Sequence, residues 1–430
     1  MTRYLIWLII GLSLRLILIP TTTYSDLHAI AYALHLLPFE GELDIYGRLR
    51  EIDLETSPVP FLHYDFFTYP PLSYYFFGGV MWLLKPLYTD SFAAAISSPH
   101  DVLMTYQPQI FLWLTLYKLP FLPFDIGAAF VLTRFFTDSA SKLRAFALWM
   151  LNPVPIIAGY LFGQFDVVPA FFVLLSLLEF KRGHPWRSAL IIGVAACFKS
   201  YPLILIPVLA VVATRPWWKR GLMVLTGLAP FVLSLQLVRG SPVALEVIFN
   251  SRPAQRIFQS TLPLGDALDM TASIYVFLLL YCIILLHAWY KTKGDFDDLL
   301  SYGLAILLLA YAFSFSHLQW LTWSIPLIVL DWVRNPKNQI IHLVLIGTAI
   351  MISLTWQFGA PEEFLGPFGV KCKTAEECLS FSELIEPYIY PLHFANIMRS
   401  IFAGAVVYWI YSSVFKDKDS DDSESSRFQT

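Results

Sequence analysis

The chain contains little charge for its length. Asp, Glu, Lys and Arg make up 14% of its 430 residues, whereas soluble domains average about 25%. Hydrophobic residues reach 57%, too many to bury in one ordinary core, so lipid must solvate much of the surface. The net charge of −3, with basic residues spread over the ends of apolar runs, excludes nucleic acid as a partner.

The chain also lacks the short motifs of several enzyme classes. It has no Walker loop, no dinucleotide-binding fingerprint and no HExxH sequence, and no Asp-x-Asp pair follows the first apolar run. Transferases that use nucleotide-diphosphate sugars commonly need carboxylates to bind a metal ion. A lipid monophosphate carries less charge, and Lys, Arg or His can bind it without metal. We therefore expect neither a metal ion nor another cofactor.

Cysteine is scarce, with four in the chain. Cys197 and Cys282 lie in apolar runs and are expected to be packing residues. Cys372 and Cys378 flank a polar KTAEE segment. They form a disulfide if that loop faces an oxidising compartment, and are two free thiols otherwise.

Long apolar runs fill most of the remaining sequence. A bilayer restricts spanning segments to helices or a closed barrel, and runs near the roughly 20 residues that cross the hydrocarbon favour helices. The sequence therefore predicts an all-α, polytopic bundle of about twelve spans. The expected spans are 4–20, 116–136, 145–163, 167–180, 188–201, 202–214, 221–238, 272–290, 299–316, 319–332, 340–357 and 394–413.

Residues 1–413 are expected to form a single transmembrane domain. Its segment 21–115 reads as a long extracytoplasmic loop with two aromatic-rich helices lying at the membrane surface. Residues 414–430 read as a disordered cytoplasmic tail. Basic residues recur at every second loop, which assigns those loops to the cytoplasm. This orientation brings four ionisable residues to the other side of the membrane: Asp26, Asp166, Lys199 and His317.

Two aspartates on that side are candidates for chemistry. Asp26, in TTTYSDLHAIAYA, is placed to act as a general base toward a hydroxyl group. Asp166, in FGQFDVVPAFF, opens another apolar run. For both, the simpler alternative is a helix N-cap, and position alone favours that alternative for Asp26.

Charged residues inside or between apolar runs need partners or water. Lys199 and His317 each interrupt such a run. Either residue could bind a phosphate. The simpler alternative for Lys199 is a side chain that extends to the membrane interface, and for His317 it is a histidine packed at a helix turn. Arg15 and Asp125 fall within two expected spans, and we expect them to form an intramembrane ion pair.

Several segments, taken in order, resemble the GT-C superfamily of glycosyltransferases that use polyprenyl-phosphate sugars. The similarity is greatest to the mycobacterial phosphatidylinositol-mannoside mannosyltransferases and fainter to the glycosylphosphatidylinositol mannosyltransferases. The matching segments are Ser25-Asp26, TYPPL at Thr68 to Leu72, KLPFLPFD at Lys118 to Asp125, Asn152-Pro, GQFD at Gly163 to Asp166, FKSYPLILIP around Lys199, and HLQWLTWSIP from His317. Each segment is a weak signal alone, and their shared order makes chance similarity improbable.

The resemblance implies an inverting sugar transfer, most often of mannose, at the extracytoplasmic face of a cell membrane or endoplasmic reticulum membrane. Asp26 would be the catalytic base, and Lys199 and His317 would contact the phosphate of a polyprenyl- or dolichyl-phosphate donor. Asp166 would be a second acidic residue that contacts the acceptor. The acceptor would be a lipid or glycan, as in glycolipid biosynthesis. FKSYP and HLQW depart from the family's usual sequences at the last two segments.

Two other functions fit the composition. A multi-pass transporter or lipid flippase also places ionisable groups in the membrane, but such proteins are commonly built from internal repeats, and this sequence shows none. A related ligase or polymerase would use a lipid-pyrophosphate donor instead. A transfer assay with defined donors distinguishes all three functions.

Overall fold

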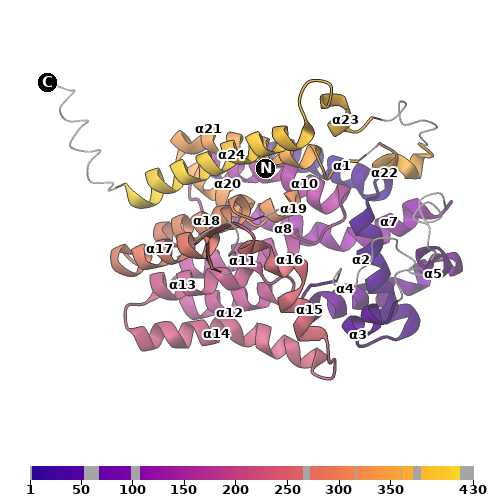
Figure 1. Ribbon diagram of the computed structural model, residues 1–430, viewed down its shortest axis with the longest axis horizontal. Helices are drawn as coiled ribbons and strands as arrows, with labels where there is room; N and C mark the ends of the chain where they lie inside the picture. The colour runs from indigo at the N-terminus through magenta and orange to yellow at the C-terminus, as the bar shows by residue number, and fades with distance from the viewer. Residues whose placement is uncertain are drawn as a thin grey trace.

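The structure, a computed structural model, describes residues 2–52, 67–97, 107–264, 272–314, 317–359, 361–370 and 379–416. Within these ranges the protein is a bundle of helices with a single small sheet (Figure 1). The expectation of an all-α fold is confirmed for these residues apart from that sheet. Cys372, Cys378 and most of the expected tail lie outside the described residues.

The elements follow one another in three groups. The first contains α1 (Thr2–Thr21), α2 (Ser25–His35), α3 (Ile45–Arg50), α4 (Pro71–Leu84), α5 (Asp90–Ile96), α7 (Ile110–Lys118) and α8 (Leu122–Thr133). The second contains α9 (Ser139–Met150), α10 (Pro153–Ile156), α11 (Val167–Lys181), α12 (Pro185–Ala196), α13 (Ile206–Ala213), α14 (Trp217–Leu235), α15 (Ala244–Asn250) and α16 (Arg252–Gln255). The third contains α17 (Val276–Lys291), α18 (Phe296–Ala312), α19 (Leu318–Leu321), α20 (Ile325–Arg334), α21 (Gln339–Leu354), α22 (Pro361–Leu365), α23 (Phe381–Ile385) and α24 (Pro391–Ile410).

Strands β1 (Thr261–Pro263) and β2 (Ser273–Tyr275) pair antiparallel between α16 and α17, with Thr261 opposite Tyr275. Among the larger helices, α11 packs on α12, α12 on α14, and α21 on α24.

Five helices among the described residues are long and apolar enough to cross a bilayer. They are Arg3–Thr21, Ile110–Thr133, Trp217–Val238, Pro336–Leu354 and Pro391–Phe415. The expected count of about twelve spans is not confirmed, because most of the other apolar runs form shorter helices. The run expected at 145–163, for example, is divided at Asn152-Pro153. Asn152 caps α10 by accepting a hydrogen bond from Val154 N at 3.0 Å, and proline cannot continue the preceding helix.

The described residues of the segment expected to be a long outer loop with surface helices are largely helical. Helices α2, α3, α4 and α5 gather at one side of the bundle, on the right in Figure 1. Helix α4 has 14 residues, a length of about 21 Å at 1.5 Å per residue, which is less than the roughly 30 Å of hydrocarbon in a bilayer. It cannot span a membrane alone, and it packs against α2 instead.

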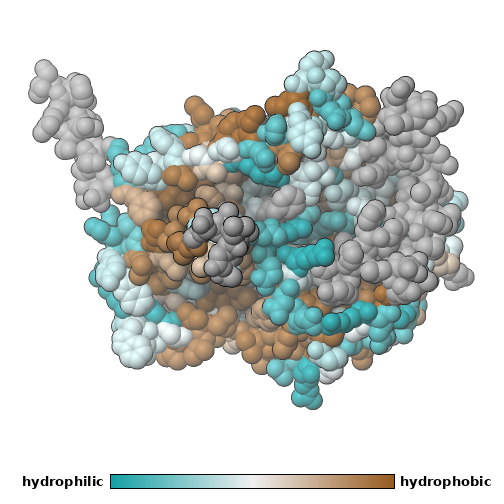
Figure 2. All heavy atoms as spheres, viewed as in Figure 1, coloured by the Kyte–Doolittle hydropathy of each residue, from teal (hydrophilic) through white to brown (hydrophobic). Residues whose placement is uncertain are grey.

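The outer surface matches a lipid environment. Ile17 on α1 is 61% exposed and Leu233 on α14 is 68% exposed, although both are fully apolar. Figure 2 shows hydrophobic surface over much of α14 and α17, with hydrophilic residues gathered toward the centre of this face. Apolar side chains turned outward in this number indicate contact with lipid chains rather than water.

Candidate functional site

Asp26 lies in the first turn of α2 and does not cap that helix. The residue before the helix is Tyr24, and no side chain caps the helix N-terminus. The Asp26 carboxylate, which is partly exposed, instead accepts a hydrogen bond at Oδ2 from Gln164 Nε2 at 3.2 Å. A carboxylate held by a single amide in this way keeps its remaining lone pairs available for a ligand.

Gln164 reaches Asp26 because of the turn that precedes it. Gly163 has a φ of 70°, which favours glycine, and a Cβ atom at this position would lie only 2.4 Å from Leu27 Cδ1. The backbone around Gly163 therefore packs directly against the residue that follows Asp26. Any side chain at residue 163 would push these two segments apart.

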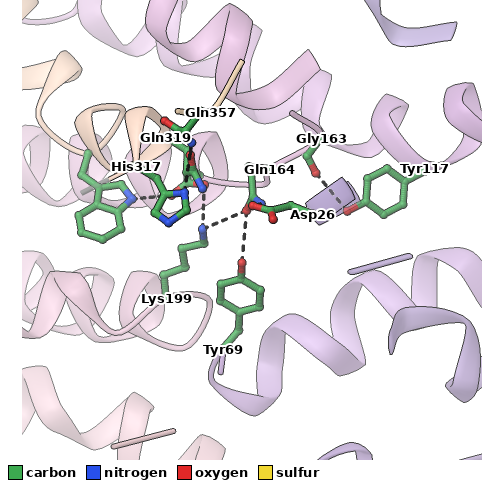
Figure 3. A network of polar contacts seen from close by, with 11 residues as sticks. Asp26, Tyr69, Tyr117, Gly163, Gln164, Lys199, His317, Gln319 and Gln357 are labelled. Carbon is green, nitrogen blue, oxygen red and sulfur yellow. Dashed lines mark hydrogen bonds and ion pairs between the residues drawn. The ribbon is translucent and has the colours of Figure 1, made fainter. Parts of the chain in front are cut away.

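The orientation of the Gln164 amide follows from its partners. Its Oε1 accepts hydrogen bonds from Tyr69 at 3.3 Å and from Lys199 Nζ at 3.5 Å, so Nε2 faces Asp26. The side chain is almost completely buried. Figure 3 shows Gln164 between Asp26 and Lys199, with the Tyr69 hydroxyl pointing to the same amide. Gln164 thus connects the candidate base to the candidate phosphate-binding lysine.

Lys199 pairs with Asp166. The distance from Lys199 Nζ to Asp166 Oδ2 is 2.7 Å, and both side chains are buried. Trp323 Nε1 donates to the other carboxylate oxygen at 2.5 Å. Asp166 occupies the N-cap position of α11, but its side chain accepts no hydrogen bond from the helix backbone. The carboxylate pairs with the buried lysine instead.

Aromatic rings surround this ion pair. Lys199 Nζ lies 4.7 Å from the ring centre of Tyr69 and 4.9 Å from that of Phe165, which adds cation–π stabilisation. On the other side, Trp323 stacks on Tyr201 with ring centres 4.1 Å apart. The ion pair of Lys199 and Asp166 is therefore surrounded by aromatic side chains.

His317 precedes α19 and contacts a glutamine cluster. Gln357 Oε1 accepts hydrogen bonds from Leu318 N and Ser353 Oγ. Its Nε2 therefore donates, both to Gln319 Oε1 at 2.9 Å and to His317 Nδ1 at 3.1 Å. Because Nδ1 accepts, the proton of the neutral imidazole lies on Nε2. Figure 3 shows His317 near Lys199, with Gln319 and Gln357 behind it.

Arg256 brings a further cation to this region. It lies in η7 (Arg256–Phe258), directly after α16, and its Cζ is 5.7 Å from the ring centre of Trp320. Trp320 in turn stacks on Trp323. The charge of Arg256 acts on both Asp26 and His317, so it belongs to the same electrostatic environment.

The ionisation of the two candidate groups reflects that environment. Burial raises the pKa of the Asp26 carboxyl to about 6, although Lys199, Arg256 and the Gln164 hydrogen bond act in the opposite direction. Burial, assisted by the charges of Arg256 and Lys199, lowers the pKa of His317 to about 3. Near neutral pH, Asp26 is therefore an ionised base with a pKa close to the ambient pH, and His317 is a neutral hydrogen-bond donor.

Arg15 and Asp125 lie apart from these groups. Arg15 Nε is 2.5 Å from Asp125 Oδ2, and both side chains are completely buried. Tyr160 donates to Asp125 at 2.7 Å, and Trp149 donates to it at 2.8 Å. This network connects α1, α8 and α9 through buried hydrogen bonds.

The structure thus brings Asp26, Asp166, Lys199 and His317 into one region from four separate segments. Sequence patterns did not point to the residues that connect them. Gln164 lies in the GQFD segment and Tyr69 in the TYPPL segment. A polar side chain beside aromatic residues was the feature of the sequence that could have indicated them. Arg256 carries no such signal, because it follows a mixed polar stretch between two apolar helices.

No group of three or more His, Cys, Asp or Glu side chains suited to a metal ion occurs within the described parts of the chain. Metal independence stays a prediction.

The comparisons with known proteins bear on this geometry. Residues 67–245 match the family model of glycosyltransferase family 87. The match covers less than half of the chain. It includes Tyr69, Gln164, Asp166 and Lys199, whereas Asp26 and His317 lie outside it. No curated protein matches the chain.

Family 87 is a family of the GT-C type, and the match together with the apolar helices indicates a membrane glycosyltransferase. A glycosyltransferase needs a sugar donor and an acceptor. A transporter or flippase is not favoured by this similarity.

Proposed function

We propose that this protein is an inverting hexosyltransferase, specifically a mannosyltransferase, that uses a polyprenyl-phosphate sugar as donor. The acceptor is a hydroxyl group of a lipid or glycan, and the site faces the extracytoplasmic side of a multi-pass membrane protein. One observation carries the proposal. Asp26, partly exposed and with a raised pKa, is joined through Gln164 to a buried lysine and lies in the same region as His317 and Arg256.

The residues divide the reaction between them. Asp26 takes the proton of the acceptor hydroxyl as that oxygen attacks the anomeric carbon, and the bond from this carbon to the donor's phosphate oxygen breaks. Polyprenyl phosphate leaves with the electrons of that bond. Attack from the face opposite the phosphate inverts the anomeric configuration.

The leaving phosphate needs stabilisation as its charge develops. The charge of Lys199 is balanced in part by Asp166 at 2.7 Å, so Arg256 supplies further positive charge. His317 contributes a hydrogen bond from Nε2–H rather than a charge. Charge-assisted hydrogen bonds are about twice as strong as neutral ones, which suits these groups to a phosphate.

A transfer assay tests the proposal. Purified protein in proteoliposomes is given a labelled short-chain polyprenyl-phosphate mannose and total lipid acceptors, and product is detected by mass spectrometry. Asp26→Asn should lower turnover by about 10²–10⁴-fold, the usual contribution of a general base. Asp138→Asn is the matched control. Asp138 caps α9 by accepting from Ser141 N at 2.8 Å, and asparagine caps equally well.

The anomeric configuration of the product checks inversion by NMR. Replacing the monophosphate donor with a pyrophosphate donor separates the proposed reaction from that of a ligase or polymerase. An Asp26→Asn protein that retains more than about a tenth of wild-type turnover is inconsistent with a general base at this position.

A further inference from the structure

A buried lysine lies beside the site but takes no part in the proposed reaction. Lys118 is the last residue of α7, within the membrane-spanning helix Ile110–Thr133, and its side chain is 0% exposed. Among the described residues no carboxylate pairs with it. Its Nζ donates instead to three close oxygens, which are Thr22 O, Thr22 Oγ1 at 3.0 Å and Tyr160 O at 2.7 Å.

These contacts provide the buried amine with oxygen acceptors. The Thr22 hydroxyl uses its own hydrogen toward Tyr160 O or Leu18 O, so its oxygen accepts from Lys118. Thr22 O, Thr22 Oγ1 and Tyr160 O are the three close acceptors, and Leu18 O lies further away at 3.3 Å.

The oxygens that bind Lys118 belong to the two segments that carry Asp26 and Gln164. Thr22 is four residues before Asp26, and Tyr160 is four residues before Gln164. The neighbouring Tyr117 donates from its hydroxyl to Gly163 O at 3.0 Å, one residue before Gln164. Figure 3 shows Tyr117 and Gly163 on the side of Asp26 away from His317.

We propose that Tyr117 and Lys118 are positioning residues, which hold the Asp26 and Gln164 segments in the register that the reaction needs. This inference rests on the proposed function for its catalytic consequence. The Lys118 amine contacts oxygens of these two segments and not the Asp26 carboxylate. Lys118 therefore works through geometry, by tying α1 to the segment that begins at η4 (Ile157–Leu161).

The experiment compares Lys118→Met and Tyr117→Phe with wild type in proteoliposomes. Methionine keeps the apolar stem and removes the amine that donates to Thr22 and Tyr160, and phenylalanine removes one hydroxyl. Misplacement of a catalytic group by about 1 Å can cost about 10²-fold in rate, so kcat of Lys118→Met should fall by about that factor. Tyr117→Phe should lose about tenfold, as expected for one hydrogen bond.

The donor KM should rise much less than kcat falls in both variants, because Lys199 and His317 lie on other segments, although Asp166, the ion-pair partner of Lys199, lies in the segment that loosens. Lys181→Met is the matched control. Its Nζ also donates to a backbone carbonyl, that of Phe135, but away from the site. This variant should keep wild-type kcat.

Hydrogen exchange measured by mass spectrometry on the same full-length proteins gives a second readout, independent of activity. Exchange in residues 20–28 and 158–166 should rise together in Lys118→Met, and other segments should keep wild-type rates. Loosened segments with an unchanged kcat would overturn the positioning role. So would a donor KM that rises in parallel with the loss of kcat, or wild-type exchange.

The two proposals fail in different ways. If Asp26→Asn stays active while Lys118→Met loosens both segments, the general base is misassigned and the connection through Lys118 stands as structure alone. If Lys118→Met does not fold, Tyr117→Phe carries the test, since it leaves the buried Lys118 amine and its oxygen partners in place.

Discussion

Gln164 Nε2 donates to Asp26 Oδ2 at 3.2 Å. The amide oxygen of the same side chain faces Tyr69 and Lys199, so one buried residue connects the carboxylate proposed to accept a proton with the lysine proposed to bind phosphate. This contact joins α2 to the segment before α11, and it makes Gln164 the residue whose substitution tests the site most directly.

Gln164→Leu should lower kcat by about tenfold or more, because a hydrogen bond to a charged group contributes about 1.5–3 kcal/mol. Gln164→Glu should be worse, since a second carboxylate would face Asp26. Steady-state kinetics with the short-chain donor measure both variants. Gln319→Leu, a nearby buried amide that accepts from Gln357 rather than contacting Asp26, serves as the comparison. Equal losses in Gln164→Leu and Gln319→Leu would show general disruption of the core.

The pH dependence of kcat/KM should report the ionisation of Asp26. The base is active only when deprotonated, and its pKa is raised to about 6, so activity should fall about tenfold per pH unit below that value. The Gln164 hydrogen bond lowers this pKa, and Gln164→Leu should therefore shift the acid limb to higher pH. An acid limb near the ordinary pKa of aspartate, about 3.9, would contradict the burial seen here.

The same raised pKa predicts an effect on stability. Folding favours the protonated carboxyl, so the stability that Asp26 contributes is fully present below its unfolded-state pKa, and it is lost as pH rises through about 6. Asp26→Asn removes this loss. Its Tm at neutral pH, read by intrinsic tryptophan fluorescence in detergent, should equal or exceed that of wild type. A marked decrease in Tm would mean that the carboxylate stabilises the fold.

Lys199 and Asp166 allow binding and stability to be separated. Lys199→Met leaves the buried Asp166 carboxylate without its ion-pair partner, which typically costs about 3–5 kcal/mol, and it should also raise the donor KM by about 10- to 100-fold. Adding Asp166→Leu should recover much of the Tm but not the donor KM. Recovery of both would show that Lys199 is purely structural.

His317 should act without changing its charge. Burial keeps its pKa at about 3, so it adds no ionisation to the rate profile between about pH 5 and 8. His317→Gln, which retains an N–H donor, should keep more of the donor affinity than His317→Ala. Titration with the donor followed by tryptophan quenching measures the difference, and equal losses would remove His317 from the phosphate contacts.

Hydropathy and charge are local properties, and the sequence alone was sufficient for what depends on them. The membrane environment, the helical class and the prediction that Arg15 needs a buried carboxylate all follow from the cost of polar groups in lipid. In the structure Arg15 Nε lies 2.5 Å from Asp125 Oδ2. The sequence also indicated Asp26, Asp166, Lys199 and His317 as ionisable residues that lie beside or between apolar runs.

Tertiary structure decided how those residues meet. Asp166 binds Lys199 and Trp323 instead of capping α11, and Trp323 is 157 residues away in the chain. Gln164 and Asp26 are separated by 138 residues. The hydropathy pattern also did not predict the helix lengths, because breaks such as Asn152-Pro153 divide runs that were expected to span the membrane. Hydrophobic periodicity indicates which face of a helix is buried. It does not indicate which residues of distant segments come into contact. The four ionisable residues that the structure gathers were therefore named from the sequence, whereas Gln164, Tyr69 and Arg256 were not.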